Sequence, residues 1–235
     1  MTHEKSPELS IIVPVLNEAA GIAAHLAMLT PLRAAGVELL VVDGGSTDAT
    51  VALARPLADA VLSAPQGRAT QMNVGAAHAQ GTTLLFLHAD TSLPPNATAH
   101  IEAVLAGGYV WGRFDVRISG QHPLLSVVAW TMNQRSRLTG IATGDQALFV
   151  RRAVFEQVGG FPELPLMEDI ALARRLKCHS PPACLRAQVL TSGRRWERHG
   201  VLRTILLMWR LRLAYFLGAD PHRLARRYGY MPRPE

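Results

Sequence analysis

Short apolar runs alternate with helix-forming segments through the N-terminal part of the chain. The first run, Leu9–Leu16 (LSIIVPVL), is continuously apolar and rich in β-branched residues, which is typical of a strand buried on both faces of a parallel sheet. The predicted strands are 9–16, 37–42, 59–62 and 83–87, and the predicted helices between them are 19–29, 47–55 and 69–79. This βαβαβαβ order predicts an α/β fold with an open, mostly parallel sheet and helices on both faces.

The rhythm changes in the second half of the chain. Residues 109–118 (YVWGRFDVRI) alternate large and polar side chains, which predicts an edge or antiparallel strand with one solvent-exposed face. A short strand at 146–150 and a helix at 168–177 follow, the helix with acidic residues in its first turn, where the macrodipole favours them. No repeat or linker divides the chain, so we expect one domain (1–198) followed by a C-terminal arm (199–235).

Positive charge is concentrated in that C-terminal segment. From Arg194 to the end, ten arginines face three acidic residues, a net charge of +7, whereas the whole chain carries only +6. Such asymmetry favours an anionic partner: nucleic acid, a phosphate-bearing substrate or an anionic membrane surface. A solvated basic surface without a partner is the alternative.

The arm also contains a long apolar segment. Val201–Leu217 is interrupted by Arg203, Arg210 and Arg212. Because a spanning helix needs ~20 predominantly apolar residues and central arginines are costly there, we expect no transmembrane segment. Aromatic residues flanked by arginines fit a helix in the bilayer interface, and equally a helix packed on the core or on a second subunit, as in a homodimer.

Cysteine usage indicates the compartment. Cys178 and Cys184 are the only cysteines, too few for a secreted disulfide framework, and the segment Met1–Glu8 does not open a signal peptide. We therefore expect a cytoplasmic protein, with association at the inner face of the membrane as the variant that the basic arm allows.

Polar clusters follow three of the predicted strands. They are VPVLNE (13–18), DGGSTD (43–48) and HAD (88–90). Ligands of open α/β sheets bind beyond the carboxyl ends of the strands, near a switch in strand order. Each cluster alone could be a turn, and Thr47 or Asp48 could simply cap the next helix. Three acid-bearing strand ends together predict a binding site.

The same segments carry a resemblance. VPVLNE, VVDGGSTD, GRATQMN, HAD and a later Glu-Asp pair are similar to motifs of family 2 glycosyltransferases with the GT-A fold, over about Leu9 to Trp196. The resemblance implies a GT-A domain that moves a sugar from a nucleotide diphosphate, with uridine the commonest base, to an acceptor. It also implies a divalent cation, Mn²⁺ or Mg²⁺, and an inverting reaction.

The resemblance assigns a group of residues to the donor nucleotide. A carboxylate at Asp43 would accept hydrogen bonds from the base or ribose, and a guanidinium at Arg68 suits phosphate oxygens, although a plain surface arginine fits equally. The implied donor-binding residues are Pro14, Asn17, Glu18, Asp43, Gly67, Arg68, Asn73, Ala89, Asp145, Arg195 and Trp196. Asp145 competes with a turn-capping role, and Arg195-Trp196 lacks the upstream glutamine of the longer motif found in processive members.

Metal binding is implied at the end of the fourth predicted strand. Asp90 matches the second acid of the family's Asp-x-Asp signature, whereas His88 replaces the first. Hard divalent ions take oxygen ligands and complete their shell with water and substrate phosphates, so one carboxylate can suffice. His88 either ligates the cation through a ring nitrogen or points away.

Catalysis is implied at Glu168-Asp169. A carboxylate at Asp169 would act as the general base that takes the proton of an acceptor hydroxyl, while Glu168 orients the site. An acidic helix start without catalytic function is the alternative.

Two other functions compete with this interpretation. A sugar-phosphate nucleotidyltransferase would open with a glycine-rich basic loop, where this chain has Asn17-Glu18. A catalytically inactive nucleotide-binding or membrane-docking protein would fit His88 in place of an acid, but not the full set Asp43, Asp90 and Asp169. The expected partners are a nucleotide-diphosphate sugar and an unidentified acceptor, lipid-like or a small alcohol, and no nucleic acid.

Overall fold

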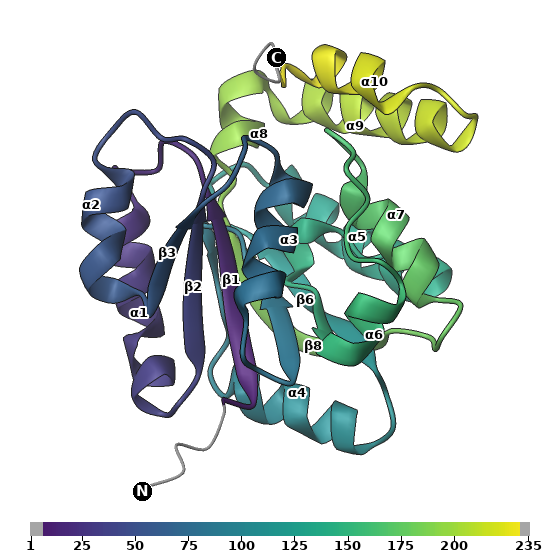
Figure 1. Ribbon diagram of the computed structural model, residues 1–235. Coiled ribbons are helices and arrows are strands. Elements are labelled where there is room, and N and C mark those ends of the chain that lie inside the picture. Colours follow the sequence, from purple (N-terminus) through teal and green to yellow (C-terminus); the bar gives the residue numbers. More distant parts are fainter. Residues whose placement is uncertain (1–6, 231–235) are drawn as a thin grey trace, which may run out of the picture.

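An eight-stranded sheet forms the centre of the computed structural model, which describes residues 7–230 (Figure 1). The strand order is β3-β2-β1-β4-β7-β6-β8-β5. The strands are β1 (Leu9–Val15), β2 (Glu38–Asp43), β3 (Ala60–Ser63), β4 (Thr83–Phe86), β5 (Thr91–Ser92), β6 (Trp111–Ile118), β7 (Phe149–Arg151) and β8 (Ala183–Thr191). Neighbouring strands are parallel from β3 to β4 and between β6 and β8, and antiparallel elsewhere, which confirms the predicted α/β fold.

Helices cover both faces of this sheet. They are α1 (Ile22–Ala34), α2 (Thr50–Ala54), α3 (Arg68–His78), α4 (Ala97–Ala106), α5 (Leu124–Thr139), α6 (Arg152–Gln157), α7 (Glu168–Leu176), α8 (Arg194–His199), α9 (Val201–Phe216) and α10 (Pro221–Tyr228), with 3-10 turns η1 (Arg55–Leu57) and η2 (Gly144–Gln146). Buried side chains of α1, α2, α4 and α5 join one core cluster, and those of α3, α6 and α7 join the other. The sheet therefore lies between two helical layers.

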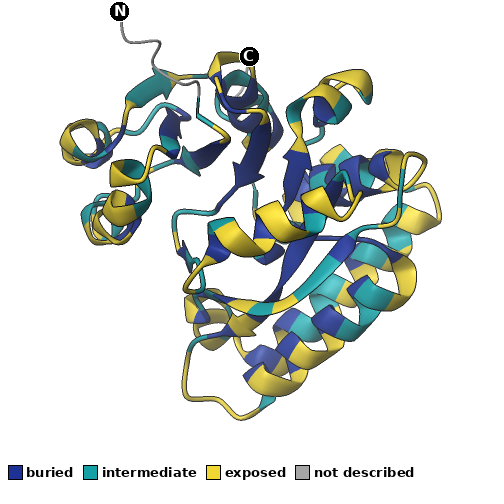
Figure 2. Cartoon of the chain, turned by 90° about the horizontal axis from the view of Figure 1, so that it is seen from below, coloured by how far each residue is buried: buried dark blue, intermediate teal, exposed yellow. Residues whose placement is uncertain are grey.

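The central strands explain this two-sided core. In β1, Ile11 and Val13 point into the first cluster and Ile12 into the second, and all three are fully buried. Successive side chains of a strand point to opposite faces, so a continuous apolar run is what two covered faces require. Figure 2 shows the buried strands between largely exposed outer helix faces.

Strand β6 differs from its prediction. Its antiparallel pairing with β7 is confirmed, but it lies inside the sheet, also pairs with β8, and has no solvent-exposed face. The polar residues that indicated a wet face are buried because they bind each other: Arg113 pairs with Asp115, Arg113 Nε donates to Ser136 Oγ (2.9 Å), and Arg137 pairs with Asp115 (2.6 Å). Paired and hydrogen-bonded charges are the ones that a core tolerates.

Several elements were not predicted. The sequence expectation omitted α4, α5 and β8, and it began the strand at 146–150 too early, because Gln146 belongs to η2. Helix α5 buries Leu125, Val128, Ala129 and Met132, a spacing of three and four residues that is typical of an amphipathic helix.

The C-terminal arm lies over the body of the protein (Figure 1). Leu211 of α9 and Leu224 and Ala225 of α10 are buried in the second core cluster. The predicted boundary between 198 and 199 falls inside α8, and the outermost ends of the two predicted units, 1–6 and 231–235, lie outside the described residues. Within residues 7–230, no helix combines the length and apolarity needed to cross a bilayer.

Candidate active site

A cavity of about 1130 Å³ opens at the carboxyl ends of β1 and β4. These strands are neighbours at the point where the strand order reverses, from β3-β2-β1 to β4 and onward, which is where open α/β sheets bind ligands. The remaining wall comes from α5, η2, the start of α7, and α8 to α10. The predicted site residues that line it are Pro14, Glu18, Arg68, His88, Ala89, Asp90, Asp145, Glu168, Asp169, Arg195 and Trp196.

Asp43 and Asn17 do not line the cavity but hold its adjoining loops. The buried carboxylate of Asp43 accepts hydrogen bonds from Gly45 N (3.0 Å) and Ser46 N (3.1 Å) of its own turn. Asn17 Oδ1 accepts from Thr47 N (2.8 Å), and Asn17 N donates to Ser46 Oγ (2.8 Å). Asp43 therefore holds the turn after β2, and the side chains of Asn17 and Ser46 join that turn to the loop after β1.

Asn73 and Gly67 also lie outside the cavity wall. The Asn73 side chain donates to Phe161 O (2.8 Å) and accepts from Phe161 N (2.9 Å), which fixes α3 to the segment after α6. Gly67 begins α3, and its carbonyl accepts from Gln71 N (2.8 Å). Gln71 in turn donates from Nε2 to Val15 O and Val42 O, at the ends of β1 and β2.

Two carboxylates could hold a cation. Burial raises the pKa of Glu18, and the nearby charge of Asp90 raises it further. A divalent cation bound beside these carboxylates would offset this repulsion. Within residues 7–230 no cluster of three His, Cys, Asp or Glu side chains suits a metal ion. A hard cation held by only two carboxylates would take the rest of its shell from substrate phosphates and water.

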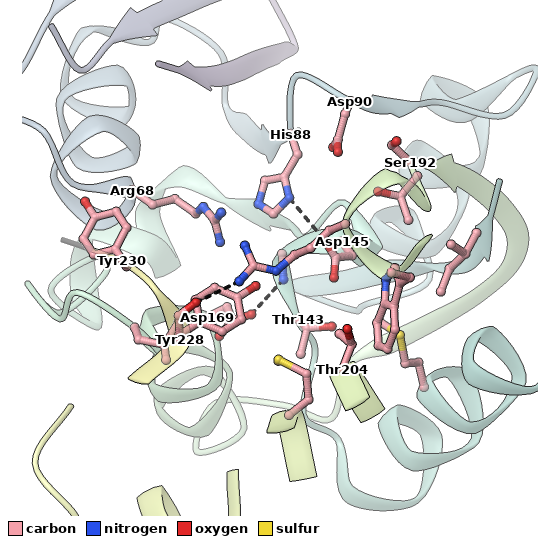
Figure 3. A pocket seen from close by; sticks show the side chains of 18 of the residues that line it. Arg68, His88, Asp90, Thr143, Asp145, Asp169, Ser192, Thr204, Tyr228 and Tyr230 are labelled. Atoms are coloured by element: carbon pink, nitrogen blue, oxygen red, sulfur yellow. Dashed lines mark hydrogen bonds and ion pairs between the residues drawn. The ribbon is translucent and has the colours of Figure 1, made fainter. Parts of the chain in front are cut away.

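His88 is engaged elsewhere. Its Nδ1 lies 3.4 Å from Asp145 Oδ1, and its Nε2 is enclosed against Gly144, where an added Cβ would come within 2.5 Å of it (Figure 3). Burial would raise the pKa of Asp145, but the hydrogen bond and charge of His88, with Arg68 and Arg212 further away, hold it below its usual range. In this arrangement the His88 ring contacts Asp145 and stabilises its charged form.

The acidic pair opens α7 as expected, with its two members in different surroundings. Asp169 Oδ2 accepts a hydrogen bond from Gly144 N (2.9 Å), while the side chain reaches the cavity. Glu168 is buried, with Oε1 3.6 Å from Arg68 Nη1. Burial, followed by the charge of Asp169, raises the pKa of Glu168, and Arg68 opposes this rise. Asp169 is thus the accessible and oriented carboxylate.

The backbone is strained beside these groups. Asn17 (φ 54°), Ala147 (φ 47°) and Met167 (φ 69°) have positive φ values, which residues other than glycine adopt uncommonly. Asn17 precedes Glu18, Ala147 directly follows η2, and Met167 precedes Glu168. Such conformations cost on the order of 1–3 kcal/mol each and concentrate at functional sites.

Arg195 and Trp196 connect the cavity to the arm. The Arg195 guanidinium lies 3.7 Å from the centre of the Tyr228 ring, and its Nη2 donates to Tyr228 O (2.9 Å). Trp196 packs against the first core cluster. Figure 3 shows Tyr228 and Tyr230 on the same side of the cavity as Arg68.

Sequence reasoning missed several lining residues. They are contributed by α5, by α8 and by the arm: Arg135, His199, Arg212, Tyr228 and Tyr230. The helical spacing of apolar residues in 124–139 would have revealed α5 and placed Arg135 on a helix. No local pattern identifies the arm residues, because only tertiary packing brings them to the cavity.

The chain is similar in sequence to known glycosyltransferases. Residues 10–159 match the model of the family "Glycosyl transferase family 2". A PGL/p-HBAD biosynthesis glycosyltransferase of Mycobacterium tuberculosis is 41% identical over 95 residues, which cover 37% of each chain. An uncharacterized glycosyltransferase of the same organism is 30% identical over 167 residues, covering 66% of this chain and 63% of the other. The chain thus matches less than two thirds of the length of either relative.

Solved structures share the fold at lower identity. Glucosyl-3-phosphoglycerate synthase from Mycobacterium tuberculosis, solved with Mn²⁺, UDP and glucosyl-3-phosphoglycerate, superposes with a TM-score of 0.62 at 20% identity, over 97% of this chain and 82% of the other. Mannosyltransferase PcManGT from Pyrobaculum calidifontis, solved with GDP-Man and Mn²⁺, gives 0.60 at 23% identity, over 80% and 57%. The architecture is the GT-A fold of these neighbours. The family match extends over more than half of the chain, and the chain therefore belongs to glycosyl transferase family 2.

Proposed function

We propose that this protein transfers a sugar from a nucleotide diphosphate, with UDP as the expected carrier, to a hydroxyl-bearing acceptor, using a divalent cation and inverting the anomeric centre. The observation that carries the proposal is the cavity itself: Glu18 and Asp90 stand at the strand ends, and Asp169, oriented by a backbone N–H, belongs to the same cavity. The two solved neighbours, which contain Mn²⁺ with GDP-Man or UDP, support this donor class.

The cavity has two ends in this proposal. The donor end comprises the loops after β1, β2 and β4, and the acceptor end comprises α5, α9 and the segment 143–169. At the donor end, Asp90 with Glu18 would hold the cation. When bound, the cation would stabilise the charge that develops on the diphosphate leaving group. Asn17 and Asp43 would keep the nucleotide-binding loops in place, which is an indirect role.

Asp169 acts as the general base. Gly144 N holds Oδ2, so that the carboxylate is fixed toward the cavity. Asp169 accepts the proton of the acceptor hydroxyl, the hydroxyl oxygen forms a bond to the anomeric carbon, and the bond from that carbon to the diphosphate oxygen breaks. The electron pair of the broken bond leaves with the diphosphate, and attack from the opposite face inverts the centre. Glu168 positions Arg68 through their ion pair.

Calorimetric titration with UDP, with and without MnCl₂, tests the donor and cation roles. The wild-type protein should bind UDP at least tenfold more tightly with Mn²⁺, and Asp90→Ala should lose that gain. Glu102→Gln is the matched control, because it removes an exposed carboxylate of α4 outside the cavity. Equal UDP affinity with and without Mn²⁺ in the wild-type protein would contradict the proposed cation dependence.

The outer face of α9 supports a lipid-like acceptor and contact with a membrane. Five apolar side chains on α9, spaced by four and three residues, are each 56–66% exposed and form what we call the α9 stripe: Leu202, Leu206, Trp209, Leu213 and Phe216. This spacing places them on one helix face. Trp209 also lines the cavity, so the stripe borders the site. With the net +7 charge from residue 194 onward, this face is suited to an anionic bilayer surface.

Co-sedimentation with vesicles tests this contact. The protein should pellet with vesicles that contain anionic phosphatidylglycerol, and much less with neutral phosphatidylcholine vesicles. Leu206→Glu should abolish the binding, whereas Leu138→Glu, at an 86% exposed leucine of α5 outside the stripe, should not. Should Leu206→Glu instead convert a dimer into a monomer in gel filtration without changing vesicle binding, the stripe would be a subunit interface.

A further inference from the structure

Two arginines in the cavity form no ion pair with any residue that the structure describes. Arg135 of α5 and Arg212 of α9 both line it. Within residues 7–230 neither guanidinium forms an ion pair, and Arg135 Nε and Nη2 and Arg212 Nε are buried without a hydrogen-bond partner. Burying an unpaired cation is unfavourable, so folding alone gives no reason to keep two of them in one cavity.

The two charges also oppose each other. Burial lowers the pKa of Arg135 to about 10, and the next contribution is repulsion by Arg212. Burial likewise lowers the pKa of Arg212. Elsewhere in the protein a buried arginine has acidic company: Arg113 pairs with Asp115, which Arg137 also contacts. Asp169 and Asp145 supply opposite charge nearby but form no ion pair with Arg135 or Arg212 among residues 7–230, so an anionic ligand can act as their direct counter-charge.

The pair lies at the acceptor end. The charges of Asp169 and Asp145 act on both guanidinium groups, which places them on the side of the general base. The same two helices also contribute apolar side chains to the cavity wall, Val128 and Met132 of α5 and Ile205 and Met208 of α9, together with the hydroxyls of Thr131 and Thr204. An anion held here would be partly removed from bulk water. Its attraction to a guanidinium would therefore be stronger than in water.

Resting on the transfer reaction proposed above, we propose that Arg135 and Arg212 form an anion subsite that binds a phosphate or carboxylate group of the acceptor. Planar guanidinium groups suit the oxygens of either anion. An inverting reaction brings the acceptor hydroxyl to the sugar from the face opposite the diphosphate. Arg135 and Arg212 lie on the side of Asp169, so they would bind the acceptor. The donor diphosphate would lie on the other side of the sugar.

Inorganic phosphate is a probe for this subsite. Protein saturated with UDP and Mg²⁺, so that the donor end is filled, should still bind phosphate in a calorimetric titration. Arg135→Gln and Arg212→Gln should each weaken phosphate binding about 10- to 100-fold, the effect of removing a hydrogen bond to a charged group. UDP affinity should stay within about twofold. Arg135→Lys should recover part of the lost phosphate affinity, because lysine keeps the positive charge but lacks the planar guanidinium.

Arg117→Gln is the control, because Arg117 is exposed on β6 and does not line the cavity. Phosphate affinity that is unchanged in folded Arg135→Gln and Arg212→Gln variants would refute the subsite. Competition between phosphate and UDP would assign the two arginines to the donor instead, and would also refute it. If UDP fails to bind but phosphate binding still depends on Arg135 and Arg212, the anion site stands and the transferase proposal falls.

Discussion

At the donor end of the cavity, polar side chains bind the chain's own backbone, whereas at the acceptor end two guanidinium groups form no ion pair among residues 7–230. Asp43 accepts hydrogen bonds from N–H groups of its own turn, and Asn17 accepts one from the turn after β2. Arg135 and Arg212 leave buried donors unpaired. The donor end is thus built before a ligand arrives, and the acceptor end has charges that a ligand can satisfy. Four predictions follow from this contrast, in order of decreasing effect.

The largest effect is expected from Asp169→Asn. General base catalysis contributes ~10²–10⁴-fold, so the turnover number should fall by that factor. UDP affinity should remain within about twofold, because Asp169 belongs to the acceptor end. Turnover of a donor sugar by transfer or slow hydrolysis measures the loss, with Glu168→Gln as the milder control. Near-normal turnover in Asp169→Asn would remove Asp169 from the mechanism and require a base elsewhere, such as Asp145.

The second prediction concerns the loss of stability in acid that follows from the buried side chain of His25. His25 of α1 is buried with Nε2 unpaired, and burial lowers its pKa to about 4 despite the opposing charge of Asp90. An unfolded histidine titrates near ~6.5, so the unfolded chain takes up the proton first as the pH falls. The free energy of unfolding should therefore decrease between about pH 6.5 and 4, by roughly 3 kcal/mol in total.

Urea unfolding at pH 7 and pH 4.5 measures this loss, with His25→Gln as the comparison. The variant should lack most of the pH-dependent difference, because its side chain does not titrate. Identical slopes in the two proteins would mean that His25 is accommodated as a cation. A buried histidine such as His25 can lose its charge by deprotonation, whereas an arginine at the acceptor end remains charged at both pH values.

Asp43→Ala should loosen the turn after β2. Hydrogen bonds to a charged group contribute ~1.5–3 kcal/mol, so the free energy of unfolding should fall by about that amount. UDP affinity should fall with it, by about tenfold or more, because the loop loses its shape. Asp43→Asn retains an acceptor oxygen and should lose less in both measurements. A loss of UDP affinity without any loss of stability would instead support direct contact between Asp43 and the nucleotide.

The smallest effect is expected from Asn73→Ala. It removes two hydrogen bonds to the Phe161 backbone and should cost about 1–2 kcal/mol in urea unfolding. UDP affinity should not change, because the side chain lies outside the cavity wall. A clear drop in UDP affinity would return Asn73 to the nucleotide-binding role that the family resemblance implied.

The same contrast explains what the sequence could predict. The parallel half of the sheet was recognised because strands covered on both faces must be continuously apolar, as in β1 and β2. Strand β6 was assigned a wet face because nothing local shows that Arg113 and Asp115 neutralise each other. The sequence motifs predict Asp90 and Asp169 as site residues, and both line the same cavity.

The remaining site residues depend on tertiary packing. Arg135 belongs to a helix whose apolar spacing was overlooked, and Arg212 lies in an apolar segment whose fit to a core helix, a subunit or a bilayer could not be distinguished by sequence. The donor contact that the resemblance implies for Asn73 remains a prediction. Asn73 matches the family pattern, yet its amide fastens α3 to the chain near Phe161.

The cavity wall runs from Pro14 to Tyr230, and this span bears on the order of folding. Contacts between residues far apart in sequence require closure of a long loop and form late. A nascent chain can therefore pair β1 with β2 and β4 well before the ribosome has released α9 and α10. Until those helices dock and Arg195 stacks on Tyr228, the pocket lacks part of its wall. Completion of the binding site is thus a readout of the docking of α9 and α10.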